Sequence, residues 1–117
     1  MLVVRVEHPL DGYGLFRSHN SMNFDGLEKM YDRHQDLPIP TYDGLSMYKD
    51  NKQWFCAYKT LEQFKEWVTT EEVQILLSYG FNIYMLEVEE FQQGSYQVVF
   101  TKRSITSYKI INSLFKT

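Results

Sequence analysis

The chain has 117 residues, of which 44% are hydrophobic and 16% aromatic, and its formal net charge is −3. This length predicts one domain with one core, and no apolar stretch approaches the roughly 20 residues that cross a bilayer. The acidic balance argues against capture of nucleic acid, and the absence of a secretory signal and of a second cysteine beside Cys56 favours a cytoplasmic protein.

The first part of the chain is predicted to hold one strand and one short helix. Residues 2–7 alternate in polarity, a strand pattern that places Arg5 on the less apolar face. Residues 11–23 are rich in Gly, Ser and Asn and predict a loop, and apolar residues at helical spacing predict a helix over 23–34. Two prolines end that helix, and residues 36–52 are predicted to form a long surface loop that covers a substrate.

Two further helices are predicted in the middle of the chain. Residues 54–57 have the composition of a short buried strand, and Thr60 begins a Thr-x-x-Gln capping box at the start of the first helix. A second helix is expected to start at Thr70 and to end at Gly80, which suits a left-handed cap.

The last part of the chain predicts strands. Residues 81–88 are apolar on both faces and therefore predict a central strand. Gln92-Gln93-Gly94 is expected to turn the chain, so that residues 95–102 pair antiparallel as the next strand. Residues 107–115 fit a strand and a helix equally well.

Two polar residues interrupt segments that are otherwise built for burial. Arg5 and Gln97 are expected to face inward from strands, where an unpaired polar group costs a few kcal/mol. They therefore either find partners or line a cleft that holds a ligand. Arg5 has Glu7 and Glu87 as alternative partners, and Cys56 is expected to act as a small buried hydrophobe.

Three motifs carry a resemblance to known proteins. Arg5 in the first strand, Trp54-Phe55-Cys56-Ala57 before a helix and Gln97-Val98-Val99-Phe100 in a late strand resemble the compact ADP-ribosyltransferase fold. The whole chain also resembles a family of small phage and prophage proteins, through Arg5 to Pro9, Cys56 to Gln63 and Gln97 to Phe100. We therefore expect an α+β fold with a compact, twisted, partly split antiparallel sheet and two or three short helices.

The resemblance implies NAD as the cofactor and assigns a role to particular residues. Arg5, or alternatively His8, would anchor the ribose and phosphates, and the middle motif would pack near nicotinamide. Gln97 stands where the transferases usually place Glu to stabilise positive charge on the sugar. The candidate catalytic residues are Gln97 and His8, and the candidate cofactor contacts are Arg5, Phe16, Arg17, Phe55, Cys56 and Ala57.

The glutamine at this position changes what the site is expected to do. Gln97 can bind a ribose hydroxyl but supplies no compensating charge. Transfer is therefore slow, relies on another acid such as Glu7 or Asp43, or is absent. His34, Asp36 and Asp43 are too irregularly spaced to predict a metal site, and none is assigned.

Two classes of function remain open from the sequence. The first is a phage-type ADP-ribosyltransferase-like protein that binds NAD and transfers ADP-ribose to a host macromolecule. The second is a non-enzymatic phage protein that binds and inhibits a host protein through exposed members of its nine tyrosines. A basic tail with Tyr108 and Phe115 offers a weaker hypothesis, stacking on a few unpaired bases.

Overall fold

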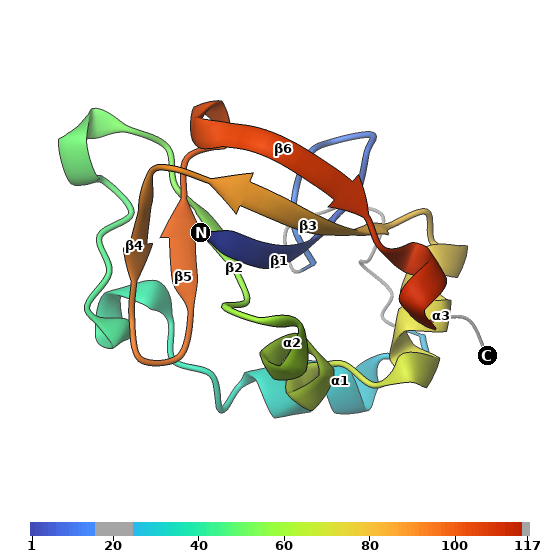
Figure 1. Cartoon of the computed structure of the whole chain (residues 1–117). Helices are drawn as coiled ribbons and strands as arrows, with labels where there is room; N and C mark the ends of the chain where they lie inside the picture. The colour runs from blue at the N-terminus through green and yellow to red at the C-terminus, as the bar shows by residue number, and fades with distance from the viewer. Residues whose placement is uncertain (16–24, 116–117) are drawn as a thin grey trace.

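Two three-stranded antiparallel sheets form the frame of the molecule in the computed structural model, which describes residues 1–15 and 25–115 (Figure 1). The described strands are β1 (Leu2–Glu7), β2 (Phe55–Ala57), β3 (Asn82–Val88), β4 (Phe91–Gln93), β5 (Val98–Phe100) and β6 (Ile105–Ile110). The described α-helices are α1 (Glu28–His34), α2 (Leu61–Trp67) and α3 (Thr70–Ser78). This arrangement confirms the predicted α+β class with a split antiparallel sheet.

The two sheets meet along β1 and β2. The first sheet has the order β1-β3-β6 and the second the order β2-β5-β4. An isolated bridge joins Val4 to Tyr58, with backbone hydrogen bonds of 3.0 and 2.8 Å. The strand β3 is central in its sheet, as its two apolar faces predict, and β5 is central in the other. The segment after β2 is therefore fixed against β1, and side chains of the two sheets, among them Val3 and Leu86 of the first and Val98 of the second, also share a buried cluster.

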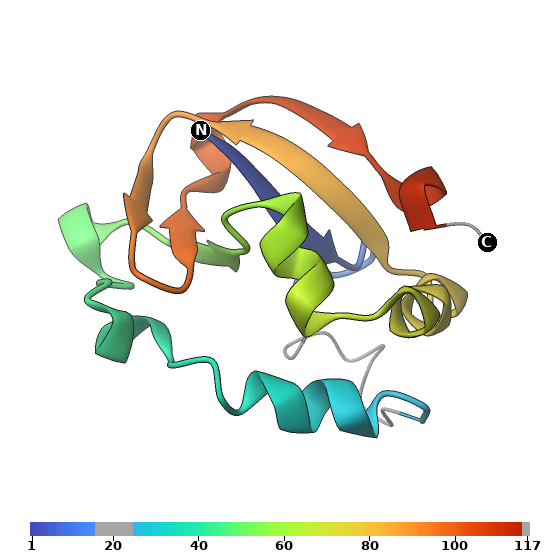
Figure 2. The same cartoon turned by 60° about the horizontal axis from the view of Figure 1, so that its bottom comes forward.

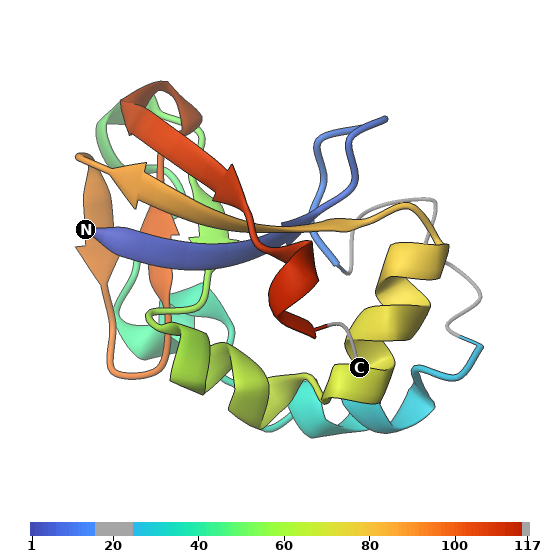
Figure 3. The ribbon, with the colours of Figure 1, turned by 45° about the vertical axis from the view of Figure 1, so that its right-hand side comes forward.

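The helices cover one face of the β1-β3-β6 sheet (Figures 2 and 3). The main core lies in this layer, where Phe64 of α2 and Val73 and Leu76 of α3 pack with strand residues Val4 and Ile83. All five are almost fully buried. Such burial stabilises the fold by about 1.5–3 kcal/mol for each large side chain. None of the described helices is both long and apolar enough to cross a membrane.

Helix termini follow the predicted signals closely. Thr60 caps α2 by accepting the Gln63 backbone N–H at 3.0 Å. The helix α3 begins at Thr70 as predicted, but its capping residue is Thr69, which forms a reciprocal box with the third helical residue. Gly80 follows the helix with φ +92°, the left-handed conformation expected at that position. The Asn23 start predicted for the first helix lies outside the described residues.

The late strands differ from the prediction. The extended segment after the turn is short, from Val98 to Phe100, and pairs with β4 and β2 rather than with β3. Gln92 and Gln93 belong to β4 and do not turn the chain, because they pair with Val99 and Val98. Both alternatives for the C-terminal segment occur, since β6 is followed by a short 3-10 helix over Asn112–Phe115.

The predicted loop over 36–52 contains regular turns. Two 3-10 helices lie within it, over Pro40–Asp43 and Lys49–Asn51. Gly44 ends the first with φ +78°. The segment is therefore positioned by its own local hydrogen bonds, and it brings Pro38 and Asp43 against the start of β5.

Candidate functional site

A cleft of about 470 Å³ lies between β1, β2 and the segment 37–47, and we call it the β1–β2 cleft. Its volume falls in the range of roughly 300–1,000 Å³ that is usual for small-molecule sites. The residues that line it include Arg5, His34, Pro38, Trp54, Phe55, Cys56, Ala57, Tyr58 and Gln97. Residues from the beginning, middle and end of the chain thus share one hollow.

Arg5 both pairs within the protein and lines the cleft. The side chain is 5% exposed, and its Nη1 donates to the Cys56 carbonyl oxygen at 2.7 Å. Its Nε lies 3.4 Å from Glu7 Oε2, so the first of the two predicted ion pairs is present. Glu87 instead contacts the N-terminal ammonium group at 3.4 Å. These contacts fix the guanidinium at the wall of the cleft.

The Phe55 ring makes cation–π contacts with two basic side chains. The Arg5 guanidinium carbon lies 5.2 Å from the ring centroid, and the Lys102 ammonium nitrogen lies 4.5 Å from it. Cations at such distances are attracted to the negative face of an aromatic ring. The ring therefore helps to hold positive charge at this edge of the cleft.

Cys56 and Ala57 complete the middle motif. Cys56 is exposed, which corrects the expectation of a buried hydrophobe, and it contributes its carbonyl oxygen to Arg5. The reason is local: in β2 the neighbouring Ala57 takes the buried position and packs with Val98 and Phe100. Both residues line the cleft.

Gln97 is held at two points by the segment before β2. Its backbone N–H donates to Asp43 Oδ2 at 3.0 Å, and its side-chain Nε2 donates to the Pro38 carbonyl oxygen at 2.6 Å. Asp43 also accepts the backbone N–H groups of Ser95 and Tyr96. No described residue donates to Gln97 Oε1, so this acceptor is available to a ligand.

The acids considered as substitutes for a catalytic glutamate are engaged elsewhere. Glu7 forms ion pairs with Arg5 and Lys102, and Asp43 accepts the three backbone N–H groups that precede β5. Neither is among the residues that line the cleft, and the described lining contains no carboxylate. Arg5 therefore brings a guanidinium into the described lining, while its partner Glu7 lies outside that lining.

His8 lies away from the cleft. Its Nδ1 accepts the Leu10 backbone N–H at 3.2 Å, so its Nε2 donates to the Tyr79 carbonyl oxygen at 3.0 Å. The ring is 4% exposed and packs edge-on against Phe81. The structure therefore gives His8 a role at the end of β1 and does not bring it to Gln97. Phe16 and Arg17, the remaining candidates, lie outside the described residues.

Sequence reasoning missed a histidine–tyrosine pair in the cleft wall. His34 Nδ1 donates to the Met30 carbonyl oxygen at 2.8 Å, and His34 Nε2 lies 2.7 Å from the Tyr58 hydroxyl. Burial lowers the pKa of His34 and raises the pKa of Tyr58. The contact to Met30 follows from helical spacing, but no signal in the sequence places Tyr58 beside this helix.

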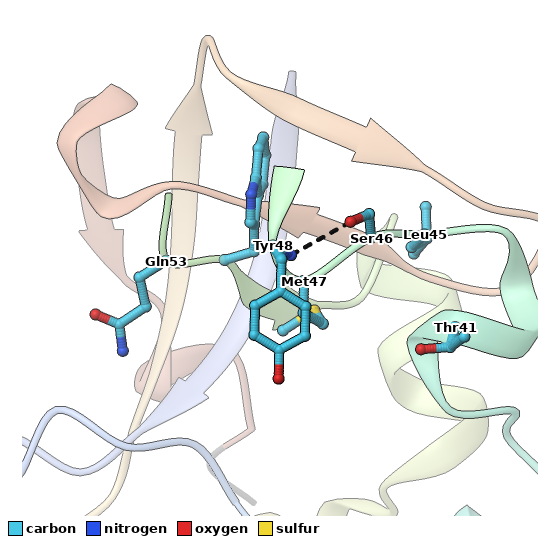
Figure 4. Close-up of a pocket in the computed structure, with 7 residues that line it drawn as sticks. Thr41, Leu45, Ser46, Met47, Tyr48 and Gln53 are labelled. Atoms are coloured by element: carbon cyan, nitrogen blue, oxygen red, sulfur yellow. Dashed lines mark hydrogen bonds between the residues drawn. The ribbon is translucent and has the colours of Figure 1, made fainter. Parts of the chain in front are cut away.

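An open pocket of about 590 Å³ adjoins the cleft (Figure 4). Met47 and Trp54 line both hollows, and Tyr48 at the pocket rim is 86% exposed. The Trp54 indole is fixed by donating from Nε1 to the Lys49 carbonyl oxygen at 3.0 Å. The segment 39–48 therefore presents aromatic surface next to the cleft.

A family model described as Bacteriophage T4 Y00F protein matches residues 1–113. The chain belongs to this family. The match confirms the resemblance to small phage proteins, and it extends over every residue of the β1–β2 cleft named above. No curated protein matches the chain, and no solved structure matches it.

Proposed function

We propose that this Y00F family member is an ADP-ribosyltransferase-like protein that binds NAD in the β1–β2 cleft. The observation that carries the proposal is the convergence of Arg5, Phe55 and Gln97 on one hollow. Each represents one of the three motifs that resemble ADP-ribosyltransferases, and they lie on β1, on β2 and directly before β5. Because these segments are far apart in the sequence, only the tertiary fold brings the three side chains to the same cleft.

The charge and rigidity of the cleft support an anionic ligand. Arg5 provides a cation, no carboxylate is present in the described lining, and a dinucleotide carries two phosphates. A guanidinium binds phosphate through paired, charge-assisted hydrogen bonds. Because the Cys56 carbonyl and the Phe55 ring already orient Arg5, little side-chain entropy is lost on binding.

The proposed chemistry is limited by Gln97. Loss of nicotinamide builds positive charge on the ribose, and a neutral amide stabilises it less than a carboxylate does. Glu7 and Asp43 are committed to other contacts. We therefore propose that the protein binds NAD well and transfers ADP-ribose to a host macromolecule slowly.

Calorimetric titration with NAD tests this proposal. We expect saturable binding by the wild type and a thermal midpoint that rises with NAD concentration. Arg5→Lys keeps the charge but loses the planar fork, and should weaken binding about tenfold. Arg103→Lys is the matched control, since Arg103 is exposed and pairs only with Glu90 among the described residues. Absence of heat and of any thermal shift at millimolar NAD would refute the proposal.

The exposed aromatic surface supports a second function, the binding of a host protein. Ile39, Tyr42 and Tyr48 are 57%, 82% and 86% exposed, and Tyr48 belongs to the open pocket in Figure 4. Tyrosines of this kind offer large contact area at low entropic cost. A host protein retained by the wild type should be lost by the double variant Tyr42→Ser, Tyr48→Ser. If the double variant still retains the host protein, or if Tyr108→Ser on β6 loses it to the same extent, the surface around Tyr42 and Tyr48 is not the binding site.

A further inference from the structure

Two hydrogen bonds of His34 fix the direction of the protons between Met30, His34 and Tyr58. The Met30 carbonyl oxygen only accepts, so His34 Nδ1 must carry the hydrogen. In a neutral imidazole the other nitrogen is then an acceptor, and burial of this ring favours the neutral form. His34 Nε2 therefore accepts from the Tyr58 hydroxyl.

Tyr58 has consequently used its single hydrogen inside the protein. Its phenolic oxygen keeps acceptor capacity and has no second hydrogen to donate. The ring makes an edge contact with Phe64, with centroids 5.1 Å apart, and the Tyr58 backbone is fixed by its bridge to Val4. The hydroxyl is thus a fixed acceptor on a residue that lines the cleft.

The surroundings favour a flat ligand group at this acceptor. Trp54 and Phe55 line the same cleft, together with Pro38 and Pro40. Aromatic and proline surfaces pack well against a planar ring. The best complement to an acceptor in such a wall is a ring that carries an N–H₂ donor.

We propose that Tyr58, oriented by His34, selects dinucleotides that present an N–H₂ group on a ring and rejects those that present only an acceptor there. The inference rests on the proposed function, because it concerns recognition in the same cleft. NAD has two such groups, the nicotinamide carboxamide and the adenine amine. An oxygen acceptor placed against the Tyr58 oxygen would leave both unpaired in a desolvated site.

Binding of three ligands to the wild type tests this selection. The ligands are NAD, its nicotinic-acid counterpart with a carboxylate for the carboxamide, and its hypoxanthine counterpart with a carbonyl for the adenine amine. We expect one of the two counterparts to bind at least about tenfold more weakly than NAD, and its identity assigns the end that meets Tyr58. Tyr58→Phe should reduce that ratio to within about threefold, since no acceptor remains.

The control variant is Tyr84→Phe, which also removes a tyrosine hydroxyl, but from a residue of β3 that does not line the cleft. It should leave the ratio at the wild-type value. Equal binding of all three ligands to the wild type would overturn the selection and leave NAD binding intact. A ratio that survives in Tyr58→Phe would overturn it as well. Failure of NAD itself to bind would overturn the proposed function and the selection together.

Discussion

In the proposed function, Gln97 is the residue that favours NAD binding over transfer. Its amide is anchored to the Pro38 carbonyl oxygen and its backbone to Asp43, so the side chain is placed without any ligand. An amide can accept a ribose hydroxyl but provides no negative charge for an oxocarbenium-like transition state. Under the proposed function, Gln97 therefore occupies the position of the catalytic glutamate without supplying its charge.

Gln97→Glu should raise the rate at which NAD releases nicotinamide, by roughly tenfold or more, because a carboxylate stabilises the developing charge. The measurement is nicotinamide production at saturating NAD. The Pro38 carbonyl will oppose the new carboxylate, so the thermal midpoint should fall while the rate rises. Gln53→Glu makes the same change at an exposed position outside the cleft and should leave the rate unchanged. A folded Gln97→Glu protein with no gain would contradict the assigned position.

His34 predicts how stability depends on pH. Burial is the main reason that the pKa of His34 lies below the usual histidine value of 6.5, with a smaller effect of Arg33 in the same direction. The bond to Met30 and the charge of Glu72 act in the opposite direction. The unfolded chain therefore takes up a proton before the folded one as the pH falls below about 6.5. The free energy of unfolding should decrease from there until His34 itself titrates in the folded state.

Urea denaturation of His34→Gln between pH 7 and pH 5 checks this expectation. The variant should have a flatter pH dependence than the wild type over this interval, because the titrating group is gone. Its stability at pH 7 is expected to be lower, since Tyr58 loses its acceptor. Parallel curves for the two proteins would show that the acid sensitivity has another source.

At the scale of elements, the entry to β5 depends on a distant carboxylate. Asp43, at the end of a 3-10 helix, accepts the backbone N–H groups of three consecutive residues, with Oδ1 bound to Ser95 and Oδ2 to Tyr96 and Gln97. Hydrogen bonds to a charged group contribute about 1.5–3 kcal/mol each. These three hydrogen bonds fix the turn before β5, and they thereby hold the Gln97 backbone at the wall of the cleft.

Asp43→Asn should lower the free energy of unfolding by about 1–3 kcal/mol, because only one of the two side-chain atoms can still accept. It should also weaken NAD binding, since Gln97 loses its backbone anchor. Chemical denaturation and NAD titration give the two quantities. Asp36→Asn changes a carboxylate of the same segment that has no described role in this turn, and it should leave both nearly unchanged. An effect on stability without any on binding would separate Asp43 from the site.

Local patterns predicted the elements better than their partners. Alternation identified β1, apolar faces identified β3 as central, and a Thr-x-x-Gln box marked the start of α2. The start of α3 at Thr70 was also predicted, but its capping box at Thr69 was not. The turn before β5 was misplaced because Gly94 is a turn signal that says nothing of the two residues before it, and the place of Gln92 and Gln93 in β4 comes from pairing with β5. Such strand pairing depends on the tertiary fold and cannot be predicted from the local sequence pattern.

The candidate site shows the same limit. Arg5 and Gln97 were recognisable because polar residues in buried strands need partners, and the middle motif was recognisable by resemblance. The pair of His34 and Tyr58 was not, because its members lie on a helix and after a strand, and only the packing of α1 against the β1–β2 junction brings them together. His8 was misjudged because its partners, the Leu10 N–H and the Tyr79 carbonyl, are backbone groups.

At the scale of the whole molecule, the two sheets are joined by a backbone bridge and a shared cluster of buried side chains, and a hollow lies beside the bridge. The bridge between Val4 and Tyr58 holds β1 against the chain after β2, and the segment 37–47 closes the other side. A ligand bound there contacts residues from both sheets, so it should stabilise the complete domain.

The most direct measurement is a crystal structure of the protein with NAD bound at saturating concentration. We predict electron density for the dinucleotide in the β1–β2 cleft, with a phosphate or ribose oxygen within hydrogen-bond distance of Arg5 and a ribose hydroxyl at Gln97. Density confined to the open pocket beside Tyr48, or an empty cleft in crystals soaked at millimolar NAD, would contradict the account.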